Sequence, residues 1–180
     1  MNTILLILAA AFGVLVIYEV SHFIRSYLHL RGQRIVTCPE THQPAGVRLA
    51  AAKIAGESML GVPNLELSNC TRWPEKQGCA QECLSQIRES NQSCLVANIV
   101  NRWYFGKNCI YCRRPFTALH WHDHPPALVD KNQKTVLWKD VSLEKLQETM
   151  ATHLPVCWSC HIAETFRREH PELVTDRPFH

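Results

Sequence analysis

Residues 109–112 (CIYC) and 157–160 (CWSC) are two Cys-x2-Cys pairs, and they decide the fold expected for the C-terminal part of this 180-residue chain. Two thiolates separated by two residues can hold one metal ion from a tight turn, and two pairs supply the four sulfurs of a tetrahedral site. Zinc favours such a site because it binds thiolates and has no ligand-field preference for another geometry. We therefore predict a zinc site formed by Cys109, Cys112, Cys157 and Cys160.

A second motif lies between and beside these pairs. Residues 122–126 (HDHPP), together with the second pair and His161, resemble the pattern of the HNH endonucleases over roughly residues 109–168. The resemblance implies a treble-clef fold, in which a cysteine knuckle and a hairpin precede a helix that opens with the second pair. If the family's roles carry over, His124 is the general base that activates water, and Asp123 and His161 bind a catalytic divalent metal.

The chain also departs from the HNH pattern. The family's middle asparagine has no clear counterpart, since Asn132 lacks glycine-rich surroundings. Few basic side chains are available to hold a phosphate backbone, namely Lys107, Arg113, Arg114, Arg167 and Arg168. The alternating His120, His122 and His124 also fit the polar face of a hairpin strand, with Trp121 facing the core. We therefore expect an HNH-like module without a catalytic residue, keep nuclease activity as an alternative, and do not expect nucleic acid as a partner.

Residues 157–161 (CWSCH) also match the attachment sequence of c-type haem, with His161 as an axial ligand of the iron. Haem is attached covalently outside the cytoplasm, whereas the topology argued below places this segment inside. Haem would also leave Cys109 and Cys112 unexplained. Haem c is therefore an alternative cofactor, and it would make the chain an electron carrier.

Five further cysteines precede residue 106. Two expected strands end at Cys38 and Cys70, and a helix expected over residues 79–88 places Cys79 and Cys83 one turn apart on one face. These four cysteines predict a second four-cysteine site, which brings the expected zinc content to two. The same thiolates also suit an iron–sulfur cluster. Cys94 is left over and is expected to be a buried free thiol.

The N-terminal stretch 4–18 (ILLILAAAFGVLVIY) carries no charge, and its apolar character continues to Ile24. As a helix, residues 4–24 extend about 31 Å, which matches the hydrocarbon core of a bilayer. The first three residues contain no basic residue and no small-residue cleavage site follows the stretch, so a cleaved signal peptide is not favoured. Apolar residues recur at helical spacing up to Leu28, and Gly32 is expected to end the helix.

Basic residues indicate the orientation of this span. No Lys or Arg precedes it, whereas Arg25, Arg31 and Arg34 follow it closely. The excess of positive charge on the cytoplasmic side predicts a single-pass protein of the cell inner membrane with its soluble part in the cytoplasm. That compartment is reducing, so the cysteines are expected to bind metal rather than form disulfides or redox dithiols.

The fold class expected is α+β: a transmembrane helix followed by two small metal-stabilised modules. The domains expected are the anchor with its juxtamembrane helix (1–33), a first cysteine-rich module (34–105) and a treble-clef-like zinc module (106–180). In the first module the expected strands are 34–38, 46–49 and 65–70, and the expected helices are 50–60, 79–88 and 95–104. In the second, an extended stretch 116–138 precedes helices 142–152 and 157–170.

Composition supports metal-stabilised modules. The chain has nine cysteines and ten histidines, and much of its apolar content lies in the anchor. The remaining modules therefore have few apolar core residues and need disulfides or bound metal to be stable. A net charge of +3 without any run of like charges gives no nucleic-acid-binding tail. The whole chain resembles cysteine-rich bacterial membrane proteins with a single span, a resemblance that implies no activity. We therefore expect a non-catalytic zinc-binding scaffold that docks to another protein.

Overall fold

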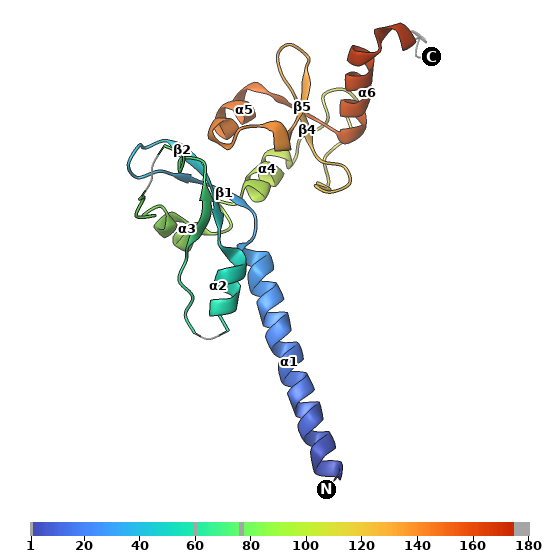
Figure 1. The fold of residues 1–180 in the computed structure, drawn as a ribbon. Coiled ribbons are helices and arrows are strands. Elements are labelled where there is room, and N and C mark those ends of the chain that lie inside the picture. The colour runs from blue at the N-terminus through green and yellow to red at the C-terminus, as the bar shows by residue number, and fades with distance from the viewer. Residues whose placement is uncertain (1, 60, 76–77, 175–180) are drawn as a thin grey trace. The chain divides into compact units, whose positions relative to one another are not determined.

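The computed structural model describes residues 2–59, 61–75 and 78–174 of the chain, and its helices and strands are drawn in Figure 1. The chain divides into two compact units, Met1–Val96 and Ala97–His180. Each unit combines helices with a three-stranded antiparallel sheet, so the content is α+β, as predicted. Leu60, where a predicted helix ends, and residues 175–180 of the predicted zinc module lie outside the described residues.

The first unit begins with one uninterrupted helix, α1 (Asn2–Leu30) (Figure 1). Its segment Thr3–Leu30 is long and apolar enough to cross a membrane. Ile7 and Ile17 are 67% and 71% exposed, so these large apolar side chains are not covered by the described part of the chain. The predicted anchor and the juxtamembrane helix are therefore one element. Gly32, with a φ of +109°, follows its end in a conformation that favours glycine.

The sheet of the first unit has the order β1-β2-β3, formed by β1 (Gln33–Thr37), β2 (Pro44–Leu49) and β3 (Leu67–Cys70). Two short helices accompany it, α2 (Ala51–Glu57) and α3 (Leu84–Ser90). Buried side chains of the sheet and of these helices form one core, which consists of Val36, Val47, Leu49, Ile54, Leu67, Cys83 and Ile87. The three predicted strands are all present, shifted by one or two residues at their ends.

The helix predicted for residues 79–88 begins later than expected, because α3 starts only at Leu84. Gly78 and Gln81 have φ values of +82° and +58°, and this left-handed conformation cannot continue a right-handed helix. Cys83 is the N-cap residue of α3, and Cys79 lies in the loop before it. The prediction that these two sulfurs share one helical face was therefore wrong.

A buried arginine joins α1 to the rest of the first unit. Arg34 is fully buried, and its Nη1 donates to the carbonyl oxygens of Leu30 at 2.7 Å and Gly32 at 3.2 Å. Its Nη2 donates to the carbonyl of His29 at 3.2 Å, and its Nε donates to Oδ1 of Asn91 at 2.9 Å. The guanidinium thus pairs carbonyls at the C-terminal end of α1, where the helix dipole favours a cation. Burial lowers the pKa of this arginine.

The second unit contains α4 (Val96–Tyr104), whose first residue belongs to the preceding unit, and a sheet of order β5-β4-β6. Its strands are β4 (Ala127–Val129), β5 (Thr135–Leu137) and β6 (Leu154–Val156), and its further helices are α5 (Leu146–Thr152) and α6 (Trp158–Glu169). Short 3-10 turns occupy Trp138–Asp140, Leu143–Lys145 and Pro171–Leu173. Strands β4 and β5 are the only ones within the predicted extended stretch 116–138.

Aromatic side chains tie α4 to the sheet of the second unit. The buried hydroxyl of Tyr104 donates to the carbonyl of Ala127 in β4 and accepts a hydrogen bond from Trp138 Nε1 at 3.1 Å. Trp103 donates from Nε1 to the carbonyl of Met150 at 3.0 Å. These contacts place α4 in the second unit, whereas the boundary expected from the sequence lay behind this helix, near residue 105.

Candidate metal centre

The first cysteine pair occupies a tight backbone turn. The amide of Cys109 donates to the carbonyl of Arg114 at 2.9 Å, and the amide of Arg113 donates to the carbonyl of Cys109 at 3.0 Å. Arg113 has a φ of +61°, which closes the turn in the left-handed region. The amide of Ile110 also donates to the carbonyl of Pro155 at 3.1 Å, so the turn is fastened to strand β6.

The second pair opens helix α6. Strand β6 ends at Val156, and Cys157 follows as the N-cap residue of α6 with an extended backbone. Cys160 lies in the first turn of this helix. The amide of Cys157 donates to the sulfur of Cys109 at 3.4 Å, which is a direct link between the two pairs. The predicted helix 157–170 is therefore present, with the predicted pair at its start.

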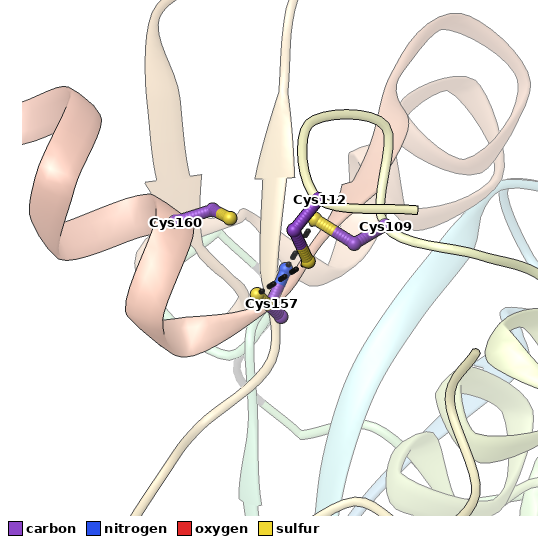
Figure 2. A group of neighbouring side chains, drawn as sticks. All are labelled: Cys109, Cys112, Cys157 and Cys160. Atoms are coloured by element: carbon purple, nitrogen blue, oxygen red, sulfur yellow. Dashed lines mark hydrogen bonds between the residues drawn. The ribbon is translucent and has the colours of Figure 1, made fainter. Parts of the chain in front are cut away.

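The four sulfurs converge on one point. All lie within 4.8 Å of one another, and the sulfurs of Cys112 and Cys157 are 3.7 Å apart. Figure 2 shows the turn that carries Cys109 and Cys112 facing the first turn of α6. The distance of 3.7 Å is well above the length of a disulfide bond, about 2.05 Å. The cluster can hold a metal ion such as zinc.

Apolar packing shields one side of the cluster. Cys109 has no exposed surface and packs with four core residues of the sheet, which are Ala127, Val129, Leu137 and Val156. Phe116 and Trp158 pack against the same core, while Cys112 is exposed. The site thus lies at the edge of the core, where Cys109 is buried, Cys157 and Cys160 are half-buried and Cys112 is exposed.

The thiols differ in how readily they ionise. Burial acts to raise the pKa of Cys109, but hydrogen bonds from the backbone amides of Cys112, Cys157 and Tyr111 outweigh it and lower the pKa to about 7. The pKa of Cys160 is raised strongly, first by burial and then by the neighbouring thiols, beginning with Cys157. Four thiolates so close together repel one another, so a cation at their centre is needed to ionise all four.

The three residues of the HNH resemblance lie in different settings. His161 follows Cys160, and its Nδ1 is buried without a hydrogen-bond partner. Burial and the charge of Arg168 lower the pKa of His161. Asp123 and His124 are exposed, and within the described part of the chain neither forms a hydrogen bond or ion pair with His161. Their catalytic roles stay a prediction.

The histidines expected on a hairpin strand form a turn instead. The amide of His124 donates to the carbonyl of His120 at 3.0 Å, and the two residues form an isolated β-bridge around residues 121–123. Trp121 donates from Nε1 to Oδ1 of Asn101 at 3.1 Å. The prediction of alternating faces along a strand was wrong here, because five residues closed by one bridge leave no room for an extended segment.

The second predicted set of cysteines lies in the first unit. Cys38, Cys70, Cys79 and Cys83 all line one pocket of that unit. The pKa of Cys83 is raised to about 11 by burial first, and then by the neighbouring thiols of Cys70, Cys79 and Cys38. Cys94 is half-buried, does not line this pocket, and donates from its sulfur to the carbonyl of Gln86 at 3.8 Å.

No protein-family model matches the chain, and no curated protein or solved structure matches it. The chemistry of the site is therefore argued from its own residues. The sequence pointed to the four sulfurs of the C-terminal cluster and to tight turns whose backbone amides point at them. It did not indicate the link between the pairs, in which the amide of Cys157 donates to the sulfur of Cys109.

Proposed function

We propose that this chain is a membrane-anchored zinc protein whose cytoplasmic part is a non-catalytic module that binds another protein. The observation that carries the proposal is the convergence of four sulfurs within 4.8 Å. A tetrahedral zinc ion with bonds of about 2.3 Å places its sulfurs about 3.8 Å apart. The Cys112–Cys157 separation of 3.7 Å has this value, so the site needs little rearrangement to accept zinc.

The order of elements around the sulfurs supports a treble-clef module. A knuckle at Cys109 comes first, the hairpin β4–β5 follows, and α6 opens with the second pair (Figure 1). This is the layout that the resemblance to HNH proteins implies. In such a small unit zinc is structural: the core alone is thin, and the metal joins the knuckle to the helix.

The pairing of the sulfurs argues against the haem alternative. In c-type haem attachment, Cys157 and Cys160 each form a thioether and are no longer thiolate ligands. Here both face Cys109 and Cys112, and the amide of Cys157 already donates to Cys109. A four-thiolate metal site uses all four sulfurs, whereas haem uses two.

The anchor supports a binding role, and among the described residues Asp123 and His124 form no hydrogen bond with His161. Helix α1 is of the length and polarity of a membrane span, and the basic residues that follow it favour a cytoplasmic soluble part. On α6, one turn apart, Ile162 and Phe166 are each 47% exposed. We propose that this apolar face of a metal-held helix contacts the protein partner.

The unpaired Nδ1 of His161 favours one second candidate, an HNH-like nuclease in which His161 binds a divalent metal with Asp123. Incubating the full-length chain with DNA and Mg²⁺ or Mn²⁺ separates the two functions. Cleavage that His124→Ala abolishes would establish the enzyme.

The test of the zinc proposal is elemental analysis of the full-length chain purified in detergent, with an absorption spectrum of the same sample. A colourless protein that loses one zinc per chain in Cys160→Ser, but not in Cys94→Ser, supports it. A Soret band or stoichiometric iron that disappears in Cys160→Ser would instead show that the centre is not zinc.

A further inference from the structure

The first unit contains a backbone turn that repeats the knuckle at Cys109. The amide of Cys109 donates to the carbonyl of Arg114, five residues later, at 2.9 Å. The amide of Arg113, four residues after Cys109, donates back to the carbonyl of Cys109 at 3.0 Å. At Cys38, the amide donates to the carbonyl of Gln43 at 2.9 Å, and the amide of His42 donates back to Cys38 at 2.8 Å. His42 has a φ of +54°, and Arg113 at the equivalent position has +61°. The two turns therefore share one backbone conformation.

Thr41 stands in the Cys38 turn at the position that Cys112 occupies in the C-terminal knuckle, three residues after the first cysteine of the turn.

Three further sulfurs are brought to this turn by other elements. Cys38 follows β1 and Cys70 ends β3, the two strands that flank β2. Cys79 and Cys83 come from the loop before α3, and all four cysteines line one pocket. Cys79 also receives a backbone amide, since the amide of Gln81 donates to its sulfur at 3.4 Å. The four thiols thus come from three segments of the chain.

We propose that Cys38, Cys70, Cys79 and Cys83 form a second metal site, in which the Cys38 turn is a knuckle that has one cysteine instead of two. Its ligand class is a soft divalent ion that accepts four thiolates, and zinc is the ion expected in a cytoplasmic protein. Binding releases the thiol protons to the solvent. The proposal stands independently of the C-terminal centre, because the two sets share no residue.

One basic and two acidic side chains line the pocket, those of Arg72, Glu40 and Glu82. Four thiolates around a divalent ion carry a net charge of −2, and Arg72 supplies a positive charge beside them. Its Nη1 donates to Oε1 of Gln43 at 2.9 Å, its Nη2 pairs with Glu75 at 3.2 Å, and its Nε is buried without a partner. Among the residues that the structure describes, only the C-terminal set has its sulfurs gathered within 4.8 Å. Metal binding is therefore expected to draw the second set closer and to tighten the loop that carries Cys79.

The experiment counts zinc per chain in the full-length protein and in matched Cys→Ser variants purified in detergent. We expect two zinc ions in the unmodified chain, one in Cys79→Ser, one in Cys109→Ser and two in Cys94→Ser, a control in the same unit but outside the pocket. One zinc in both the unmodified chain and Cys79→Ser would overturn the second site. If instead only Cys79→Ser loses zinc, the second site stands and the C-terminal centre fails.

A second measurement avoids variants that do not fold. In the unmodified chain, alkylation followed by mass spectrometry is expected to show Cys70, Cys79 and Cys83 protected until a chelator is added. Cys94 serves as the internal comparison, with the same labelling before and after chelation. Equal labelling of Cys79 with and without chelator would overturn the site. Iron with visible absorption that Cys79→Ser removes would overturn its assignment to zinc.

Discussion

The Nε of Arg34 donates to Oδ1 of Asn91 at 2.9 Å, and this bond joins the end of α1 to the segment between α3 and α4. The two residues are 57 positions apart in the chain. Through its other nitrogens Arg34 also pairs carbonyls at the end of α1. One buried side chain therefore connects α1, the first strand and a distant segment of the first unit.

Replacing Arg34 by methionine tests this connection. The change leaves Asn91 and the carbonyls of His29 and Leu30 without their charged donor, and hydrogen bonds to charged groups contribute about 1.5–3 kcal/mol each. We expect a loss of about 3 kcal/mol in the free energy of unfolding, measured by denaturation in detergent. Arg48→Met is the control, since Arg48 is exposed in the same sheet. Equal stability of the two variants would contradict the assigned role of Arg34.

Replacing Cys109 by serine tests the coupling of metal and fold in the second unit. Structural zinc contributes about 10 kcal/mol or more to the folding of small modules, so the variant is expected to lose the tertiary structure of this unit. Tryptophan fluorescence reports the loss, because Trp103 and Trp138 lie in its core region. Cys94→Ser should keep both fold and metal. A Cys109→Ser protein that keeps them too would show that the four-cysteine site is wrong.

Replacing Tyr104 by phenylalanine tests the packing of α4. Burial raises the pKa of Tyr104, so its hydroxyl stays neutral and keeps donating to Ala127. Without the hydroxyl, the carbonyl of Ala127 and Nε1 of Trp138 lose their buried partner, which costs about 1–3 kcal/mol. Chemical denaturation followed by fluorescence measures the change. Tyr111→Phe, at a site 37% exposed, is expected to have little effect.

Replacing His124 by alanine tests the enzyme alternative. His124 is exposed and makes no described side-chain hydrogen bond, so the variant should fold and bind zinc like the unmodified protein. We expect no divalent-metal-dependent DNA cleavage by either protein. If the unmodified chain cleaves DNA and the His124→Ala variant does not, the protein is a nuclease and the proposed binding role is wrong.

A reporter fused after the last residue tests the orientation. The basic residues after the span predict that the C-terminal end is cytoplasmic, so a reporter that is active only in the cytoplasm should be active. Replacing Arg25 and Arg31 with glutamine is expected to reduce this activity. These two residues suit the test better than Arg34, because the side chain of Arg34 is buried and hydrogen-bonded within the first unit. Activity of a reporter that works only outside the cytoplasm would reverse the topology.

The sequence predicted the elements whose signals are local. The apolar run around Ile7, the strands near Val36 and Val47, and the start of α6 at Cys157 all follow from composition and spacing. The sequence prediction was wrong where a single backbone conformation determines the structure. Gln81 has a left-handed conformation, so α3 begins only after Cys83, and no residue propensity in that segment indicates this. The single-cysteine knuckle was also hidden, because Thr41 removes the Cys-x2-Cys spacing.

Arg34 illustrates a different limit of the sequence. As a basic residue after the span it indicates the orientation, and nothing in the local sequence shows that it is buried. Its partner Asn91 is far away in the chain, so the pair becomes visible only in the folded structure. The sequence likewise predicted the four sulfurs of the C-terminal cluster, but not the link in which the amide of Cys157 donates to the sulfur of Cys109.

As the membrane span proposed above, the unbroken helix α1 would set how far the first unit stands from the bilayer. Its 29 residues extend about 43 Å at about 1.5 Å per residue. A hydrocarbon core of about 30 Å leaves roughly 13 Å, about twice the thickness of the headgroup layer of one leaflet. Because Arg34 fixes the helix end to the first strand, no flexible tether intervenes. Tilting of the helix in a thinner or thicker bilayer would therefore tilt the first unit with it.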